Sequence, residues 1–508
     1  MHTDARAIDN QSLIEGDLCI IGAGAAGISM ALEFVNSSQT VILLESGGFE
    51  YEVETQSLNQ GYNVGQNYFP LKASRLRFFG GTTGHWAGFC APLDPIDFEE
   101  RPWVPHSGWP FTKQDLDPFY ERAQKVCELG PYNYETTYWE KLRPESAPLS
   151  FDKSKVRTKM WQKSPPTRFG TKYRDTIVGA PNINLYTYAN LTNIELNESG
   201  REVIGLEIKT LSGRVHRVQA KMYVLACGAI QNVRCLLNSK AVMKNGIGNH
   251  HDLVGRFFME HPHVDSADMI LASDHNMDLY FESFLTSKEF GMLTLAEAYQ
   301  RREKLLNYSA QLVPTSSGAE RQHVIDLIPD DAKFTIDFMK GIDQAKKEGK
   351  QDVNPETKIY IFSTRVEQAP NPDSRVELAK TNDALGISEV NLNWQLSDLD
   401  KRTIKEANLA IGKELGKIGL GRLRLQDWLF EENHQWPRFM AGGFHHMGIT
   451  RMNKNPKKGV VDENCKIHGL PNMYIASSSV FPTSGIANPT LTIVALAIRL
   501  ADHLKKMI

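Results

Sequence analysis

The chain contains the segment Asp17-Leu-Cys-Ile-Ile-Gly22-Ala-Gly24-Ala-Ala-Gly27, in which an apolar run leads directly into three glycines spaced G-x-G-x-x-G. Gly22 permits a tight turn, Gly24 lets the backbone approach a pyrophosphate, and Gly27 lets the following helix lie close to the strand. Such a helix also points its first N–H groups and the positive end of its dipole at the phosphates. The segment therefore predicts the start of a βαβ unit that binds a dinucleotide.

Glu45 closes the next apolar run, Thr40–Leu44, and lies 18 positions after Gly27. A carboxylate at the end of this second strand can accept hydrogen bonds from ribose hydroxyls, and it would repel a 2′-phosphate. With a first strand expected over 18–21 and a helix over 25–35, the sequence predicts a dinucleotide site that disfavours NADP.

The composition argues against several classes of function. The 508 residues carry 57 basic and 60 acidic side chains, for a net charge of −3, and no basic stripe or tail, so nucleic acid is not an expected partner. No apolar run reaches about 18 residues, so no transmembrane helix is expected. Residues 1–16 lack the charged-then-apolar pattern of a secretory signal, and the direct interpretation is a cytoplasmic protein.

The cysteines and histidines give no metal-binding pattern. Six cysteines are scattered without C-x-x-C or other metal-ligand spacing, which argues against structural zinc, an iron–sulfur cluster and a disulfide framework. His250, His251, His261 and His263 lie close together in the sequence, but no cysteine or carboxylate pattern flanks them. We therefore expect no metal site.

Residues 183–225 alternate between apolar and polar side chains as strands do. The expected strands cover 183–186, 203–208, 215–218 and 222–226, with Ser212-Gly213 as a hairpin turn between two of them. Cys227-Gly228-Ala229 then leads into an expected helix over 230–237, a second place where a sheet could approach a cofactor closely. An earlier helix is expected over Asp115–Leu129, with Thr112 as its cap.

The central part of the chain has a different sequence pattern, in which expected strands and helices are mixed. Residues 359–366 and 376–378 are expected to be strands of an antiparallel sheet, and Lys401–Ile418 an amphipathic helix. The charged stretch Lys340–Asp352 is expected on a solvated surface, and residues 51–79 look irregular.

Nucleotide-type signals therefore occur at both ends of the chain, around a chemically different middle. This arrangement predicts an α/β fold with a Rossmann-like nucleotide-binding domain built from discontinuous segments, and an α+β substrate-binding domain with its own antiparallel sheet. The expected boundaries are 1–100, 161–262 and 440–508 for the nucleotide-binding domain, 101–160 for a substrate or cap region, and 263–439 for the substrate-binding domain.

Two C-terminal blocks complete a recognisable set of motifs. Residues 442–452 read Gly-Gly-Phe-His-His-Met-Gly-Ile-Thr-Arg-Met, and a block rich in glycine, serine and proline covers 468–492. Further motifs are Gly80-Gly81-Thr82-Thr83, Trp109-Pro110, Ala226–Ala229, Val254-Gly255-Arg256 and His261-Pro262. In this order, over nearly the whole chain, they resemble the glucose–methanol–choline (GMC) flavoprotein oxidoreductases. Within that family the chain is most similar to flavin subunits of bacterial sugar and polyol dehydrogenases (fructose and gluconate dehydrogenases) and to pyranose oxidases.

The resemblance implies an FAD-dependent oxidoreductase that acts on CH–OH donors. It places the catalytic base at His445 and its partner at Asn488, with the adjacent His446 as a competitor for the base. A neutral imidazole suits removal of a hydroxyl proton, and a second polar group must hold the same oxygen. The cofactor-binding residues expected from the glycine motifs and the resemblance are Gly22, Gly24, Gly27, Glu45, Gly80, Gly81, Thr83, His85, Gly228, Ser478, Pro489 and Thr490.

His85 raises a separate question about the flavin. In pyranose oxidases the histidine before tryptophan in this loop carries a covalent bond to FAD, and His85-Trp86 keeps that pair. Gly84 replaces the usual threonine, so a non-covalent histidine packed on the flavin is favoured over the bond.

The expected reaction is oxidation of a hydroxyl of a sugar, polyol or glycoside to a carbonyl, by proton abstraction and hydride transfer to flavin N5. The electron acceptor, a quinone, a cytochrome subunit or O2, stays open, and so does an oxidase of the pyranose-oxidase type. The competing classes are a non-redox lyase that contains FAD, an NAD-dependent dehydrogenase and an inactive flavin-binding partner protein. Flavin subunits of the resembling dehydrogenases are often exported with a partner, so a periplasmic location stays an alternative to the cytoplasm.

Overall fold

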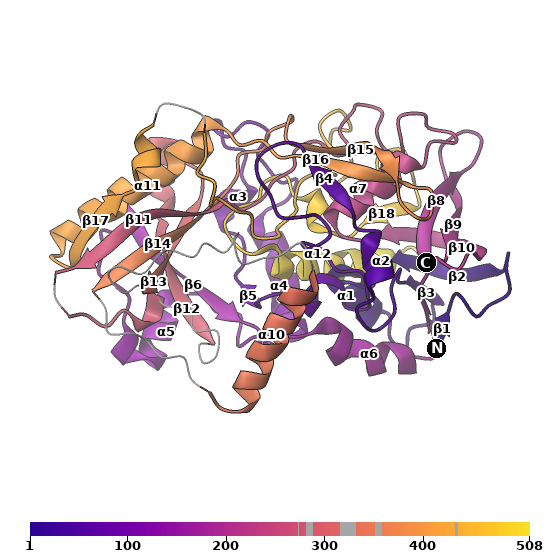
Figure 1. Cartoon of the computed structure of the whole chain (residues 1–508), viewed down its shortest axis with the longest axis horizontal. Coiled ribbons are helices and arrows are strands. Elements are labelled where there is room, and N and C mark those ends of the chain that lie inside the picture. Colours follow the sequence, from indigo (N-terminus) through magenta and orange to yellow (C-terminus); the bar gives the residue numbers. More distant parts are fainter. Residues whose placement is uncertain (273, 281–287, 315–331, 351–357, 432–434) are drawn as a thin grey trace.

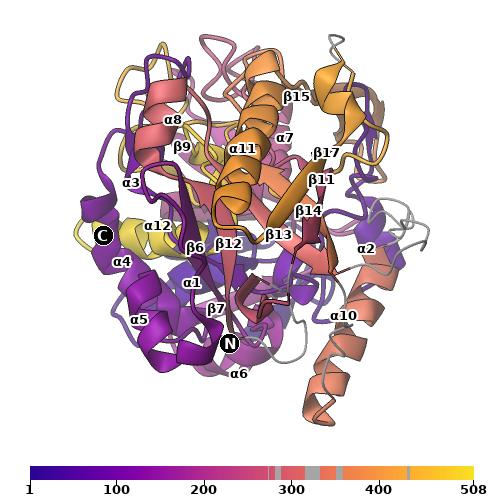
Figure 2. The same ribbon diagram turned by 90° about the vertical axis from the view of Figure 1, so that its left-hand side faces the viewer.

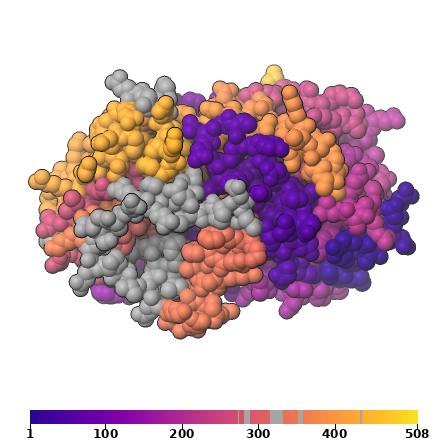
Figure 3. All heavy atoms as spheres, in the orientation of Figure 1, coloured from indigo at the N-terminus to yellow at the C-terminus, as the bar shows by residue number. Residues whose placement is uncertain are grey.

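The computed structural model describes residues 1–508 except 273, 281–287, 315–331, 351–357 and 432–434. Two large sheets lie towards opposite ends of the long axis of the molecule (Figure 1). On the face shown in Figure 3, N-terminal segments in indigo and purple lie directly beside segments of the middle of the chain in magenta and orange. Among the described residues, every helix is too short or too polar to span a lipid bilayer.

The first sheet is a Rossmann-like parallel sheet with an antiparallel extension. Its order is β1-β7-β3-β2-β10-β9-β8, and β18 pairs with β10. In this order, each neighbouring pair as far as β2-β10 is parallel, and so is the pair of β18 with β10. β9 is antiparallel to both of its neighbours, β10 and β8. The strands are β1 His2–Asp4, β2 Leu13–Ile21, β3 Val41–Leu44, β7 Ile183–Thr187, β8 Asn190–Leu196, β9 Val203–Lys209, β10 Val215–Leu225 and β18 Met473–Ile475.

This sheet draws its strands from the N-terminus, the middle and the C-terminus of the chain, as the sequence predicts for discontinuous segments. The expected hairpin at Ser212-Gly213 joins β9 and β10. The two expected segments 215–218 and 222–226 form one long strand, β10. The reason is that β2 begins as early as Leu13, so its pairing with β10 starts at Arg217 and spans both segments. β1 and β8 are strands that the sequence did not predict.

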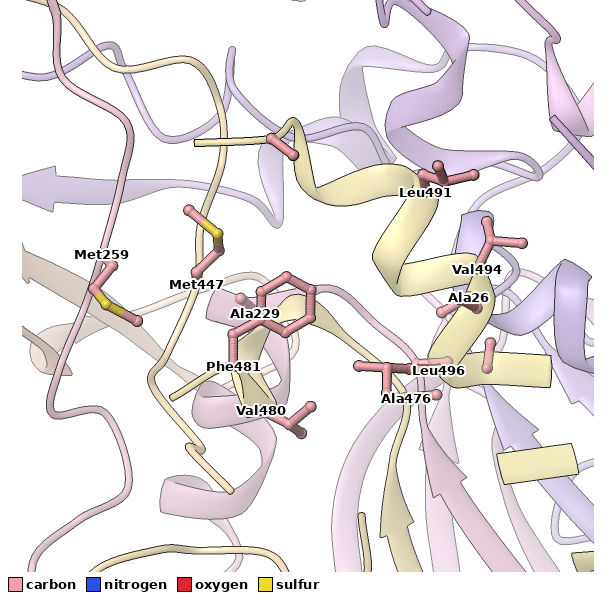
Figure 4. Close-up of a cluster of buried hydrophobic side chains, with 14 of the residues drawn as sticks. Ala26, Ala229, Met259, Met447, Ala476, Val480, Phe481, Leu491, Val494 and Leu496 are labelled. Carbon is pink, nitrogen blue, oxygen red and sulfur yellow. The ribbon is translucent and has the colours of Figure 1, made fainter. Parts of the chain in front are cut away.

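Helices from both ends of the chain cover the parallel sheet. α12 (Pro489–Leu504) packs against α1 (Ala25–Glu33) and α4 (Lys113–Val126). Figure 4 shows Val494 and Leu496 of α12 close to Ala26 of α1. α12 therefore anchors the C-terminal block to the first βαβ unit through apolar contacts. At the start of α4 the Thr112 N–H donates to Asp115 at 2.8 Å, so the predicted capping residue is confirmed.

The second sheet is antiparallel throughout, in the order β17-β11-β14-β13-β12-β6-β5. The long helix α11 (Asp398–Lys417) packs across it, as Figures 1 and 2 show. The strands are β5 Phe89–Cys90, β6 Val156–Lys163, β11 His263–Leu271, β12 Glu289–Leu295, β13 Tyr308–Pro314, β14 Ile359–Val366 and β17 Gly421–Leu425. The predicted α/β fold with a separate antiparallel sheet is confirmed, whereas the residue boundaries of the domains stay predictions.

A third, small sheet corrects two expectations. Residues 376–378 belong to β15 (Arg375–Asn382), which pairs with β16 (Ser388–Asn393) and not with the strand at 359–366. β16 also pairs with β4 (Gly61–Asn63), so residues 51–79, expected to be irregular, contain a strand and the short helix α2 (Val53–Ser57). The sheet was missed because β4 lies far from β15 and β16 in the chain, beyond the reach of local pattern.

The other helices are mostly short connections. The charged stretch expected on the surface lies on α10 up to Lys347 and is exposed or half-exposed there, while residues 351 and 352 lie outside the described residues. The remaining helices are α3 Pro95–Phe98, α5 Thr136–Leu142, α6 Phe169–Gly179, α7 Ala229–Asn238, α8 Glu297–Glu303 and α10 Ala332–Lys347.

Candidate active site

The three N-terminal glycines each meet a different steric demand. Gly22 directly follows β2 and has a φ of +104°, which L side chains rarely adopt. A Cβ on Gly27 would lie 1.9 Å from the Gly22 carbonyl oxygen, so only glycine lets α1 lie this close to β2. A Cβ on Gly24 would meet no atom within 4 Å. The space beside Gly24 is therefore kept open for something other than protein.

Glu45 stands at the end of β3, as the sequence predicts. Its carboxylate accepts hydrogen bonds from the N–H groups of Ala23 at 3.0 Å and Gly47 at 2.9 Å. The side chain is buried but lines the same cavity as Gly24, and burial raises its pKa. Glu45 thus joins the loop after β2 to the loop after β3 and places carboxylate oxygens at the cavity wall.

The Gly80–Gly84 loop lies over the start of α1. Gly80 has a φ of +101°, and a Cβ there would lie 2.6 Å from the Gly170 nitrogen. A Cβ on Gly81 would lie 3.1 Å from Gly24 Cα. Thr83 Oγ1 donates to the Gly80 carbonyl at 2.7 Å and accepts from the Phe169 N–H at 3.2 Å. Gly80 therefore packs against α6, whereas Gly81 approaches the nucleotide loop.

A cavity of about 390 Å³ runs along these loops to the C-terminal block. Three helices begin at its wall, with Gly24, Gly228 and Asn488 as the N-caps of α1, α7 and α12. Helix N-termini favour anions, because their first N–H groups are free and the dipole is positive there. Of the sequence-predicted residues, those that line the cavity are Gly22, Gly24, Glu45, Gly81, Thr83, His85, Gly228, His445, His446, Ser478, Asn488, Pro489 and Thr490.

Gly27 and Gly80 do not line the cavity. Each packs one backbone segment against another, so both support the site without facing it. A Cβ on Gly228 would meet no atom within 4 Å, as at Gly24. Open space at two helix N-termini, joined by one cavity with a carboxylate at its wall, fits the pyrophosphate and ribose of FAD.

The structure brings His445 and Asn488 together at the wall of the same cavity. His445 Nε2 lies 3.3 Å from Asn488 Nδ2, although the two residues are 43 positions apart. Asn488 Oδ1 accepts a hydrogen bond from the indole N–H of the buried Trp161 at 3.3 Å, which orients the amide. Burial lowers the pKa of His445 well below its usual value, so its imidazole is neutral at neutral pH.

His446 points to a different set of partners. Its Nε2 lies 2.8 Å from the Tyr68 hydroxyl, and its ring packs beside Tyr68 and Phe258. Burial lowers the pKa of His446 to about 3, and the charge of Arg75 acts in the same direction. His445 is the less buried of the two residues and the one whose ring contacts Asn488.

Sequence reasoning missed the groups that hold these two histidines. Glu260 is fully buried, and its carboxylate accepts from the N–H groups of His261 at 2.7 Å, Gly443 at 3.0 Å and His445 at 2.6 Å. The Tyr68 hydroxyl donates to the same carboxylate at 2.7 Å. No local pattern marks Tyr68 or Glu260, because each acts only through contacts with distant segments.

The four neighbouring histidines separate in the structure. His261 and His263 lie beside His445, with ring centroids 5.0 and 6.0 Å from its ring, whereas His250 and His251 are exposed on a turn. Within the part of the chain that the structure describes, no three His, Cys, Asp or Glu residues are grouped to hold a metal ion.

His85 is buried at the cavity wall. Burial lowers its pKa to about 4, and its Nε2 has no hydrogen-bond partner among the described residues. A Cβ on the preceding Gly84 would lie 2.6 Å from the Phe78 ring. The loop around His85 therefore has no room for a threonine at position 84 unless Phe78 moves.

Comparisons with known proteins support the family that the sequence motifs indicate. A family model described as GMC oxidoreductase matches residues 370–497, and one described as FAD dependent oxidoreductase matches residues 17–243. Over 96% of its length the chain is 25% identical to 6'''-hydroxyparomomycin C oxidase of Streptomyces lividus, covering 92% of that protein. Over 97% of its length it is 22% identical to the fructose dehydrogenase large subunit of Gluconobacter japonicus, covering 98% of that protein.

A solved structure gives the same fold. Formate oxidase from Aspergillus oryzae RIB40 superposes with a TM-score of 0.57 over 98% of this chain and 99% of that chain, at 16% identity. At this level of identity the likeness concerns the fold alone.

Proposed function

The chain belongs to the GMC oxidoreductase family of FAD-dependent enzymes that act on CH–OH groups, and from this we propose that it oxidises a hydroxyl of a sugar, polyol or glycoside to a carbonyl. One observation carries the proposal. The His445–Asn488 pair, 3.3 Å apart, opens into the same cavity as the nucleotide loops at Gly24 and Glu45. A proton acceptor and an amide thus stand beside the site that fits FAD.

The residues that would hold FAD line this cavity. The N-terminus of α1 at Gly24 would take the pyrophosphate, Glu45 the ribose hydroxyls, and the backbone at Gly81 and Gly228 would permit close approach. When bound, FAD accepts the hydride that leaves the alcohol carbon.

His445 would act as the general base. The substrate O–H bond breaks, its proton forms an N–H bond on His445 Nε2, and its electron pair becomes part of the new C=O bond as the hydride leaves. A neutral imidazole is required for this step, and the lowered pKa of His445 provides it.

Asn488 would hold the reacting oxygen. The indole N–H of Trp161 donates to the amide oxygen of Asn488, so the Nδ2 group faces His445. Nδ2 can then donate to the hydroxyl oxygen of the substrate and to the negative charge that develops on that oxygen. An oxygen shared by His445 and Asn488 is fixed in position, which aligns its carbon for transfer.

A polyhydroxylated substrate is supported by the cavity wall and by the relatives. His263 of β11 and Arg365 of β14 line the cavity from the antiparallel sheet, where they are register partners. The two relatives are named for oxidation of a paromomycin compound and of fructose. These names support a sugar-like substrate for this chain.

Anaerobic reduction of the bound flavin tests the function. We expect the purified yellow protein to bleach with at least one member of a panel of monosaccharides, polyols and glycosides. Re-oxidation with O2, a quinone and a cytochrome then identifies the electron acceptor. A colourless protein that uses NAD, or a yellow protein that cleaves the panel without bleaching, would contradict the proposal and favour a nicotinamide dehydrogenase or an FAD-containing lyase.

We also expect FAD to be bound without a covalent link. Gly84 offers no hydroxyl beside His85, and Phe78 occupies the space of a larger side chain there. After acid precipitation the pellet should be colourless and the intact mass should equal that of the chain alone. A yellow pellet whose mass exceeds the chain by one FAD, and which becomes colourless in His85→Ala, would overturn this expectation.

A further inference from the structure

Two strand-like segments hold His261 against His445. Met259 and Met447 exchange backbone hydrogen bonds, each at 3.0 Å, and His263 and Ala441 exchange another pair at 2.8 and 3.0 Å. Met259 and Met447 face each other across these two segments in Figure 4. The two backbones are thus fixed relative to each other on both sides of the histidine pair, and the Glu260 carboxylate binds the N–H groups of His261 and His445 between them.

The hydrogen bonds of His261 determine which of its nitrogens carries a proton. His261 Nε2 lies 2.9 Å from the Gly485 carbonyl oxygen, which can only accept, so Nε2 must donate. Burial lowers the pKa of His261 to about 4, so the ring holds one proton at neutral pH. Its Nδ1 therefore carries a lone pair.

The same reasoning extends to His445. His261 Nδ1 lies 2.9 Å from His445 Nδ1. Because His261 Nδ1 accepts, His445 Nδ1 must donate, and the single proton of a neutral His445 is placed on Nδ1. His445 Nε2 is left as a lone pair that faces Asn488 Nδ2 at 3.3 Å.

We propose that His261 is a positioning residue that fixes His445 in the Nδ1–H tautomer through the chain Gly485–His261–His445. This inference rests on the proposed function, in which His445 Nε2 receives the substrate proton. In the opposite tautomer Nε2 would carry a hydrogen and could not accept. After proton transfer, His261 Nδ1 still accepts from His445 Nδ1 and stabilises the cation.

The groups that face the His445 ring limit the interpretation of its titration. They are His261, His263, Arg365 and the adjacent His446, all of which act to lower its pKa when charged. Burial lowers the pKa values of all three histidines, to about 4 for His261, about 3 for His446 and well below the usual value for His263. These neighbouring histidines are therefore neutral in the neutral range. Glu260, which accepts from the His445 N–H, belongs to the same cluster, and burial raises its pKa to about 7.

His261→Leu tests the proposal, because leucine keeps much of the volume and removes both ring nitrogens. In the FAD-bound protein we expect anaerobic flavin reduction to slow roughly 10²-fold, since His445 can now adopt the inactive tautomer. The acid limb of the pH profile should move to lower pH, because protonated His445 loses the hydrogen-bond acceptor that His261 Nδ1 provides. His261→Gln keeps a donor and an acceptor on one planar group and should recover part of the rate and return the limb towards its original pH.

The matched control is His216→Ala. His216 is also a buried histidine whose Nε2 contacts a carbonyl oxygen, that of Ala5 at 3.0 Å, but it lies in the parallel sheet. The His216→Ala variant should leave the rate of flavin reduction and the acid limb of its pH profile unchanged. Nitrogen-15 NMR of ring-labelled histidine, with the His445 signal identified by its loss in His445→Ala, should show a protonated Nδ1 and a bare Nε2 that lose this distinction in His261→Leu.

Three results would overturn the inference: normal reduction in His261→Leu, slow reduction with an unmoved acid limb, or a protonated Nε2 on His445 in the parent protein. They differ from failure of the proposed function. If His445→Ala itself reduced at the parent rate, the base would be misassigned, whereas a slow His445→Ala beside a normal His261→Leu would refute the positioning role alone.

Discussion

Gly24→Val is expected to purify as a folded, colourless protein that binds no FAD. The backbone at Gly24 has φ −87° and ψ −163°, an extended conformation that valine adopts without strain, so the fold should tolerate the change. A Cβ there meets no protein atom within 4 Å, and the two methyl groups would enter the space at the N-terminus of α1. That space is where we expect the pyrophosphate. The flavin absorbance per chain measures the effect directly.

Gly179→Val is the matched control for this variant. Gly179 ends α6 and is exposed, and a Cβ there would likewise meet no atom within 4 Å, but the residue does not line the cavity. It should keep one FAD per chain. Circular dichroism of both variants verifies the fold, and full occupancy in folded Gly24→Val would refute the assignment of this loop to FAD.

His445→Ala is expected to keep FAD and to reduce it roughly 10²- to 10⁴-fold more slowly, which is the usual contribution of a positioned general base. Burial lowers the pKa of His445, so the neutral form predominates at pH 7, and the parent rate should fall as the pH decreases through that pKa. The alanine variant should lose this acid limb together with the rate. Anaerobic stopped-flow reduction across a pH series measures both.

His446→Ala decides between the adjacent histidines. His446 Nε2 is already engaged by Tyr68, and the serine hydroxyl of Ser478 donates to the His446 carbonyl at 2.7 Å. We therefore expect a much smaller loss of rate than in His445→Ala. The reverse order of the two variants would show that the base lies one position further along the chain.

The nucleotide loops were predictable because their determinants are local. Position 22 has a positive φ, and position 27 has no room for a side chain beside the Gly22 carbonyl. Both requirements arise within one segment of eleven residues, 17–27. Amphipathic periodicity and the Thr112–Asp115 contact similarly define α4 within its own sequence. β14 was predicted at the bounds it has, 359–366, because β-branched and aromatic residues, which favour strands, make up most of this segment.

Pairing between distant segments was not predictable in the same way. β4 and β16 lie far apart in the chain, and neither carries a signal that selects the other, so the small sheet of β15, β16 and β4 was missed. The packing of Gly80 against Gly170 was not predictable either, since it depends on where α6 docks, and a role of Gly80 at the cofactor stays a prediction.

By itself, then, the sequence determined the glycine turns, the acid at Glu45 and the histidine and asparagine types offered at positions 445 and 488, because each follows from a few adjacent residues. Only the tertiary structure decided which nitrogen of His445 is bare. That depends on His261, 184 positions away. Trp161, 327 positions from Asn488, orients the amide that faces this nitrogen, and the buried Glu260 carboxylate holds the backbone N–H of His445. Such contacts arise when two sheets and the C-terminal block pack together, and packing of distant segments leaves no periodic trace in the chain.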